Sequence, residues 1–168
     1  MTAWVALLRA VNVGGTGKLA MSELKAMCDE LGFGSAKTYI ASGNVVFKSA
    51  KSEAAIKAAL EKLLEAHAGK PVGVLIRTAA EMAQVIANNP KLAPNRTMAI
   101  FLDRAPPADP LEGVRGQKDE KIRLGRREIY VHYGEGMGSS KLVIPAARAG
   151  TARNMNTVAT LAKMAAEL

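Results

Sequence analysis

The first strand that the sequence predicts is apolar on both of its faces, and this feature limits the folds open to the chain. The run from Trp4 to Leu8 opens a strand expected over about residues 4–11. Successive side chains of a strand point to opposite faces, so both faces are apolar here. Such a strand needs cover on each side. We expect helices on one face and a second lobe, or a partner chain, on the other.

The first half of the chain has the element order of a split βαβ sandwich. Apolar spacing predicts its helices, and Ser42-Gly43-Asn44 has the composition of a tight hairpin turn. The expected elements are strands near residues 4–11, 37–41, 45–47 and 72–76 and helices near residues 19–31 and 52–69. The order β-α-β-β-α-β with short connections favours the ferredoxin-like arrangement.

The second half repeats this logic after Arg77. Thr78 and Glu81 have the spacing of a capping box at the start of a helix. Strands follow near residues 97–102, 121–124 and 128–133, and a last helix starts near Asn154. We therefore expect an α+β fold of two ferredoxin-like lobes, with antiparallel sheets and helices packed on one face. Its parts are an N-terminal βαββαβ lobe over 1–77 and a C-terminal α/β lobe with the terminal helix over 78–168. The similar element order of the two lobes predicts a structural duplication.

Charge and cysteine content bear on compartment and solubility more than on a reaction. The net charge is +8, and apolar residues make up 49% of the 168 residues, ample for a core. Such a charge favours solubility or attraction to phosphates. Cys28 is the only cysteine, so an internal disulfide is excluded. No signal peptide pattern or run of about 20 apolar residues is present, which predicts a cytoplasmic protein with no membrane segment.

The predicted topology brings two polar loops to one edge of the first sheet. The exit of the first strand and the turn between the second and third strands lie on the same side in a split βαβ unit. Glycine-rich backbone and a guanidinium together can hold an anion or a carbonyl-rich ligand. Alternatively, these are ordinary turn residues, and the arginine pairs with a carboxylate. The residues concerned are Arg9, Asn12, Gly14, Gly15, Ser42 and Asn44.

Two further polar segments lie in the second half. Lys141 follows Ser140 and a glycine-rich stretch, which favours either a second anion site or a flexible turn. Arg153, Asn154 and Thr157 precede or open the last helix. They could bind an anion at the helix start, or a single residue among them could simply cap it.

Most catalytic signatures fail on inspection. A P-loop aligned on Lys18 would need a glycine at Asn12 and Ser or Thr at Leu19. The two histidines and Cys28 are widely separated and form no metal-binding pattern, and Cys28 is expected in the core. Catalytic residues and cofactors therefore remain unknown, and no metal site is predicted.

A nucleic-acid partner is not favoured. The chain has seven aromatic residues, few for base stacking, and the third strand lacks the aromatic signature of RNA-binding sheets. One basic cluster could contact phosphates, but Asp119 and Glu120 lie within it and reduce its net charge. We therefore interpret this cluster as a solvated surface. That cluster comprises Arg115, Lys118, Lys121, Arg123, Arg126 and Arg127.

The chain resembles the bacterial "domain of unknown function 1697" family. The stretches that carry the resemblance are 7–15, 38–47, 140–142 and 151–157, with Met21 and Leu24 between the first two. Two positions depart from the family pattern, which often has glycine where Ala10 stands and an aromatic where Met155 stands. The resemblance implies a cytoplasmic α+β protein with two related lobes and no established activity.

Three functions are consistent with these patterns. The leading hypothesis is a binding module for a small anionic or nucleotide-like ligand. A second is a transferase-type enzyme that uses the same cleft, with Ser140 and Lys141 or a bound cofactor. A third is a structural or interaction protein, in which the lobes form a homodimer and no ligand binds. The predicted ligand-binding residues are Arg9, Asn12, Gly14, Gly15, Ser42, Asn44, Lys141, Arg153, Asn154 and Thr157.

Overall fold

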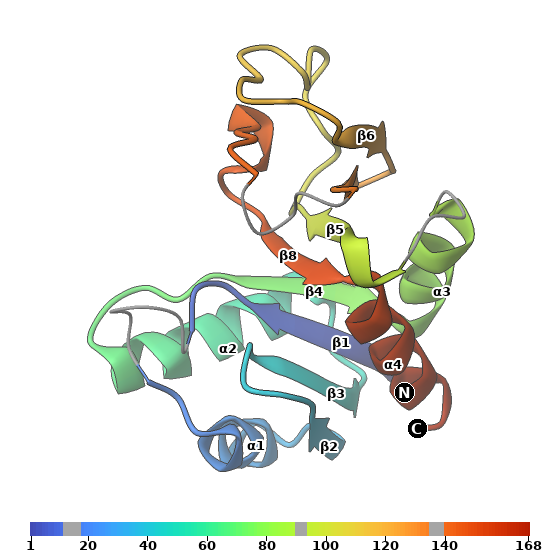
Figure 1. The fold of residues 1–168 in the computed structure, drawn as a ribbon. Coiled ribbons are helices and arrows are strands. Elements are labelled where there is room, and N and C mark those ends of the chain that lie inside the picture. The colour runs from blue at the N-terminus through green and yellow to red at the C-terminus, as the bar shows by residue number, and fades with distance from the viewer. Residues whose placement is uncertain (12–17, 90–93, 135–139) are drawn as a thin grey trace. The chain divides into compact units, whose positions relative to one another are not determined.

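The computed structural model describes residues 1–11, 18–89, 94–134 and 140–168 (Figure 1). The chain divides into two compact units, Met1–Met82 with Thr160–Leu168 (unit 1) and Ala83–Ala159 (unit 2). There are two four-stranded sheets in the described residues, and all their strand pairs are antiparallel. The expected α+β class with two ferredoxin-like lobes is confirmed.

The first sheet has the strand order β2-β3-β1-β4, which is the ferredoxin-like order. Its elements, with the two helices between them, are β1 (Thr2–Leu8), α1 (Met21–Glu30), β2 (Gly34–Thr38), β3 (Asn44–Ser49), α2 (Glu53–Ala68) and β4 (Val74–Thr78). Two strands end earlier than the sequence patterns predict. Ala10 and Ile40 adopt positive φ angles of 52° and 49°. This turns the backbone away from an extended strand just after β1 and β2.

Local sequence explains α2. The Ser52 side chain accepts a hydrogen bond from the Ala55 amide at 3.2 Å, and Gly69 ends the helix with a φ of 73°. Ile56, Leu60 and Leu64 form its buried stripe. Both termini match the positions that the sequence predicts.

Both faces of β1 are buried, as its two-sided apolar pattern requires. One face carries Trp4, Ala6 and Leu8 into a core that includes buried side chains of α1 and α2. Val5 and Leu7, which point the other way, have no exposed area. In this respect β1 behaves as the sequence predicts.

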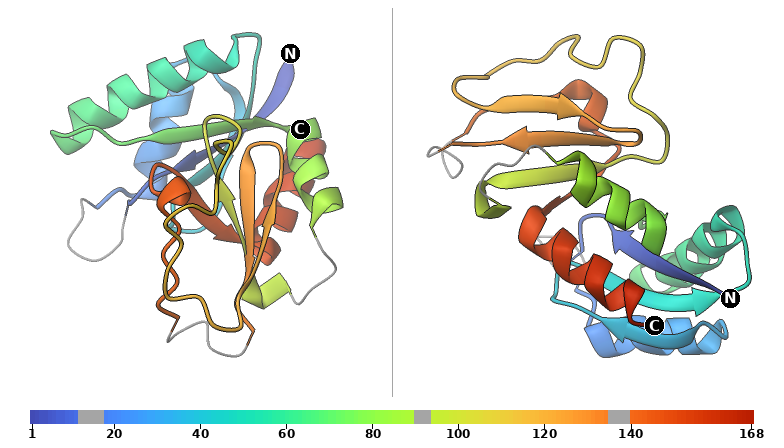
Figure 2. Two further views of the ribbon diagram at one scale, coloured as in Figure 1. Left: turned by 90° about the horizontal axis from the view of Figure 1, so that it is seen from above. Right: turned by 90° about the vertical axis from the view of Figure 1, so that its right-hand side faces the viewer.

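The second sheet has the order β6-β7-β5-β8, the same topology in chain order as the first. Its strands and the two helices near them are α3 (Ala79–Asn88), β5 (Thr97–Phe101), β6 (Lys121–Leu124), β7 (Glu128–His132), β8 (Thr151–Asn154) and α4 (Met155–Ala166). Short 3₁₀ turns cover Pro94–Arg96 and Pro145–Ala147. β8 is an element that the sequence patterns did not predict. Figure 2 shows the β6–β7 hairpin in orange.

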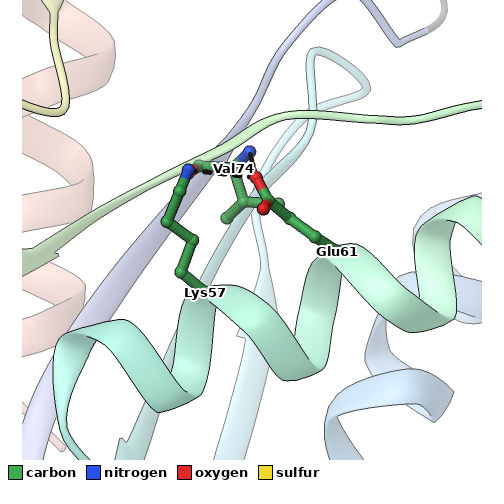
Figure 3. A network of polar contacts seen from close by, with 3 residues as sticks. All are labelled: Lys57, Glu61 and Val74. Carbon is green, nitrogen blue, oxygen red and sulfur yellow. Dashed lines mark hydrogen bonds and ion pairs between the residues drawn. The ribbon is translucent and has the colours of Figure 1, made fainter.

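Side chains close the open edge of β4 (Figure 3). Lys57 Nζ donates to the carbonyl oxygen of Val74, and a carboxylate oxygen of Glu61 accepts from the Val74 amide at 3.0 Å. The two side chains also form an ion pair of 3.0 Å. Further along the edge, the Arg77 guanidinium donates to the Ile76 carbonyl at 2.9 Å. Both backbone groups of Val74 and the carbonyl of Ile76 on this edge are thereby occupied.

The capping box at the start of α3 is present as predicted. Glu81 accepts from the Thr78 amide at 2.9 Å, and the Thr78 hydroxyl accepts from the Glu81 amide at 3.1 Å. No helix in the described parts of the chain is both long and apolar enough to cross a membrane.

Candidate functional site

The exit of β1 and the turn before β3 lie side by side at one edge of the first sheet. The amide of Leu8 donates to the carbonyl of Gly43 at 2.9 Å, and the amide of Arg9 donates to the carbonyl of Gly73 at 2.9 Å. Gly43 has a φ of 92°, and a Cβ there would lie 2.7 Å from Val11 Cγ2. This close approach requires glycine. The topological part of the prediction is therefore confirmed.

Arg9 is half-buried at this edge. Its stem packs over Gly73, where an added Cβ would lie 3.0 Å from Arg9 Cδ. Arg9 therefore lies just after the end of β1, where Gly73 covers the aliphatic part of its side chain.

Asn44 and Ser42 organise the turn itself. The Asn44 side chain is fully buried, and its amide nitrogen donates to the Tyr39 carbonyl and to Ser42 Oγ, both at 2.9 Å. The Tyr39 amide in turn donates to the Asn44 carbonyl at 2.9 Å. Both hydrogens of the carboxamide are used within the turn, so its nitrogen has none left for a ligand.

A pocket of about 240 Å³ opens next to the exit of β1. Its lining comes from the β1 exit, the approach to α1, the end of α2 and the approach to β4. The lining residues are Ala10, Val11, Lys18, Leu19, Leu64, His67, Ala68, Lys70 and Val72. The predicted site residues Asn12, Gly14 and Gly15 lie outside the described residues, and the chain that contains them joins Val11 to Lys18.

The pocket has an apolar wall and a cationic rim. Leu19 and Leu64 are buried, whereas Lys18 and Lys70 are exposed. His67 Nε2 lies 3.0 Å from a carboxylate oxygen of Glu23 on α1. Among the described residues, neither lysine forms an ion pair. The described residues of the lining include no Asp or Glu.

The predicted site residues of unit 2 have well-defined structural partners. Arg153 is buried, and its guanidinium donates to Thr151 Oγ1 at 2.8 Å and to the Ala152 carbonyl at 2.9 Å. Burial lowers the pKa of Arg153 to about 10. Asn154 Oδ1 accepts from the amide of Thr157 at 2.9 Å, which is an N-cap contact for α4.

Ser140 and Lys141 are held against a neighbouring segment of unit 2. The Ser140 hydroxyl donates to the Glu120 carboxylate, which also accepts from the Lys118 amide at 2.6 Å. The hydrogen bond from Ser140 is the main reason that the pKa of Glu120 is lowered. Lys141 is exposed. The Ser140 hydroxyl already donates its hydrogen bond to a carboxylate, so it is not available to donate to a bound anion.

Sequence reasoning missed the two lysines of the pocket and the burial of Arg77. Lys18 follows a glycine that precedes a helix, and Lys70 follows a glycine that ends one. This shared position next to a helix end is the sequence signal that could have identified them. Arg77 is only 1% exposed. Within the described ranges, no three His, Cys, Asp or Glu side chains gather where they could hold a metal ion.

Comparison with known proteins identifies the family. The family model for proteins of unknown function DUF1697 matches residues 1–130. A solved structure, described as a conserved bacterial protein from Streptococcus pneumoniae, is similar with a TM-score of 0.80 and 25% identity over 98% of each chain. No curated protein matches the chain. With its fold, the joined loops of its first sheet and a family match over most of its length, the chain belongs to the DUF1697 family of proteins of unknown function.

Proposed function

We propose that the protein binds a small molecule that carries both an anionic group and an apolar part, in the pocket beside the exit of β1. One observation carries this proposal: Lys18, His67 and Lys70 line an apolar cavity, and the described residues of its lining include no Asp or Glu. An anion at the rim would form charge-assisted hydrogen bonds with the lysines, and these bonds are stronger than neutral ones. The apolar part would cover Leu19 and Leu64.

The volume of the pocket limits the ligand. About 240 Å³ equals roughly eight water molecules at about 30 Å³ each. Pockets for drug-sized molecules begin near 300 Å³. The ligand class is therefore a small carboxylate or phosphate monoester, and a nucleotide-like ligand would place only part of itself inside.

The residues predicted from the sequence enter this proposal in two ways. Arg9 precedes the lining residue Ala10, so we assign it to the same site, whereas the role predicted for Asn12, Gly14 and Gly15, which lie outside the described residues, stays a prediction. Ser42 and Asn44 support it by holding the adjoining turn. The contribution predicted for Lys141, Arg153, Asn154 and Thr157 stays a prediction, which the variants below test.

Binding is better supported than transfer chemistry through Ser140. A serine becomes a nucleophile when a base removes its proton. The partner of Ser140 is Glu120, whose pKa is lowered, and a carboxylate of low pKa is a weak base. This contact favours a structural role for Ser140.

We also infer that the two sheets arose by duplication. Their strand orders correspond, and Arg77 and Arg153 occupy matching positions next to Val5 and Ala99. Each guanidinium donates to the carbonyl of its preceding residue at 2.9 Å. A chain with residues 75–78 in place of 151–154 should keep a cooperative unfolding transition, and its loss would count against the duplication.

Thermal shift and calorimetry test the binding proposal with simple probes. Butyl phosphate and hexanoate should raise the Tm, whereas hexanamide, which lacks the charge, should not. Lys18→Ala and Lys70→Ala should weaken binding about tenfold, equivalent to about 1.4 kcal/mol. Ala68→Leu should block the cavity without a change in charge. Lys62→Ala, an exposed lysine of α2 outside the pocket lining, is the matched control.

The outcomes separate the competing functions. Equal binding by Lys70→Ala, Ala68→Leu and the control would reject this pocket. Loss of binding in Arg153→Ala, with the fold retained, would extend the site to the second group of predicted residues. No response to any probe, together with an unchanged Tm across a panel of nucleotides, sugar phosphates and short RNA, would favour a structural or interaction protein.

A further inference from the structure

The four edge strands of the two sheets are not equally protected. The edges are β2 and β4 in the first sheet and β6 and β8 in the second. Side chains occupy exposed backbone groups of β4, and the Arg153 guanidinium occupies the Ala152 carbonyl of β8. The register of β2 against β3 shifts between Gly34 and Lys37. Bulges and side-chain cover are the usual means of blunting an edge.

β6 lacks these devices. It pairs with β7 in unbroken register from Lys121 opposite His132 to Leu124 opposite Ile129. Gly125 donates to the Glu128 carbonyl at 2.8 Å at the hairpin end. Because hydrogen-bonded pairs alternate in an antiparallel ladder, the backbone N–H and C=O groups of Ile122 and Leu124 point away from β7. No described residue forms a hydrogen bond with these four groups.

The side chains of β6 divide into a cationic face and an apolar face. Lys121 and Arg123 are exposed on one face, and Ile122 and Leu124 lie on the other, with Leu124 44% exposed. Lys118 and Arg126 add two exposed cations near the strand ends. In the described part of the chain, these four cations form no ion pair.

The two acidic residues that precede β6, Asp119 and Glu120, do not neutralise this face. Glu120 was expected to dilute the basic cluster, but it is buried. Its carboxylate accepts from the Ser140 hydroxyl and the Lys118 amide. Asp119 is exposed, so the exposed charges beside the open edge are four cations and one carboxylate, and their sum is positive.

We propose that the open edge of β6 binds an extended acidic segment of a partner protein by strand addition. The segment would alternate acidic residues, which face Lys121 and Arg123, with apolar residues, which extend the Ile122 and Leu124 face. Its backbone would pair with the four outward groups of β6. This surface belongs to unit 2 and is independent of the pocket beside β1.

Charge complementarity favours this occupant over the two main alternatives. A second copy that paired through β6 would bring the Lys121 and Arg123 side chains of both copies together, and like charges across strands are destabilising. A nucleic acid would satisfy the cations but has no peptide edge to pair with Ile122 and Leu124. Only an acidic peptide uses both features.

The test uses a blocked eight-residue peptide of alternating Glu and Val, labelled for fluorescence anisotropy, with the full-length protein. Hydrogen exchange of the Ile122 and Leu124 amides should slow when the peptide binds. The double variant Lys121→Glu/Arg123→Glu should weaken binding at least about tenfold. Lys51→Glu/Lys62→Glu, two exposed lysines of unit 1, has the same change in net charge and should bind like the wild type.

Backbone pairing is tested separately from charge. Leu124→Pro removes one outward N–H, and an edge strand tolerates proline at such a position. It should weaken binding while leaving the circular dichroism spectrum unchanged, and an N-methylated form of the peptide should not bind.

Four results would overturn the proposal. The N-methylated peptide could bind as well as the parent, or the two charge-reversed double variants could bind equally. The acidic peptide could fail to bind while single-stranded RNA binds in an Arg123-dependent way, which would show phosphate recognition. Finally, a dimer that Leu124→Pro abolishes would show that a second copy occupies the edge.

Discussion

Cys28 lies on the buried face of α1 with no exposed area, as its helical spacing predicts. Burial, with a smaller contribution from Asp29, raises the pKa of its thiol to about 12. The thiolate is the reactive form of cysteine. Cys28 therefore acts as a small core residue and is chemically inert in the folded protein.

The pH dependence of stability tests this shift. The folded-state pKa lies above the reference value of 9.0, so the contribution of Cys28 is complete below that value and is lost as pH rises toward 12. At about 1.4 kcal/mol per pKa unit, this amounts to about 2 kcal/mol between about pH 9 and 10.5. In urea unfolding experiments, the Cys28→Ala variant should not show this fall in the free energy of unfolding as pH rises. Parallel pH profiles for the two proteins would contradict the shift.

Gly43 and Gly69 separate backbone strain from steric overlap. Both have positive φ, but a Cβ at Gly43 would overlap Val11 and Leu8, whereas nothing lies within 4 Å of one at Gly69. Gly69→Ala should cost about 1 kcal/mol, for the left-handed backbone alone. Gly43→Ala should cost at least about 1 kcal/mol more, because the loops must move apart. Chemical denaturation measures both, and equal costs would show that the loop contact is loose.

At the scale of elements, the network at Val74 shows how α2 protects an edge strand. Lys57 and Glu61 have the same i,i+4 spacing as Lys25 and Asp29 on α1, and both pairs are within ion-pair distance, at 3.0 and 2.8 Å. Only the first pair also bonds to a strand. Lys57→Met should lower the free energy of unfolding by about 1 kcal/mol, because the Val74 carbonyl loses its donor.

The matched variant on α1, Lys25→Met, should cost less than about 0.5 kcal/mol, since exposed pairs contribute little. Light scattering should show faster aggregation for Lys57→Met than for Lys25→Met. Identical behaviour of the two would mean that the edge needs no protection.

Asn154 tests capping against ligand binding. Asn154→Ala should lower the free energy of unfolding by about 1 kcal/mol, because the Thr157 amide loses its partner. Asn154→Asp should restore that stability, since Asp caps as well as Asn. If Asn154 binds an anionic ligand, Asp will restore the Tm but will weaken affinity for the ligand. Thermal unfolding and ligand titration of the same two variants distinguish these roles.

Elements with strong local signals were predictable, and those that depend on distant pairing were not. α2 lies between Ser52 and Gly69 because capping and termination involve neighbouring residues only. β8 has four residues, and its burial depends on pairing with β5, which is distant in the chain. The same holds for the end of β1, where Ala10 takes a left-handed conformation at a position where the family often has glycine.

At the scale of the whole molecule, residues distant in sequence share one unit. Thr160–Leu168, at the end of the chain, belong to the same unit as β1. Leu161 and Ala165 are buried, and α3 and α4 each contain residues of both units. The division after Arg77 that the sequence suggests stays a prediction.

The single tryptophan makes this arrangement measurable. Trp4 is in β1 and is 7% exposed, so its fluorescence reports on unit 1. Leu161→Ala should lower the free energy of the Trp4 transition by about 2–5 kcal/mol, because it removes a fully buried side chain. Glu167→Ala, on an exposed position of the same segment, should change it by less than about 0.5 kcal/mol. A Trp4 transition unaffected by Leu161→Ala would remove the last segment from unit 1.

The sequence by itself determined the order of most elements, the helix caps, the hairpin turn and the burial of both faces of β1. These follow from periodicity and from hydrogen bonds between near neighbours, which a linear pattern contains. Tertiary structure decided that Lys18 and Lys70 line one pocket, that β8 completes the second sheet, and that β6 keeps an open edge. Each depends on which distant backbones and side chains meet, and no local pattern specifies that.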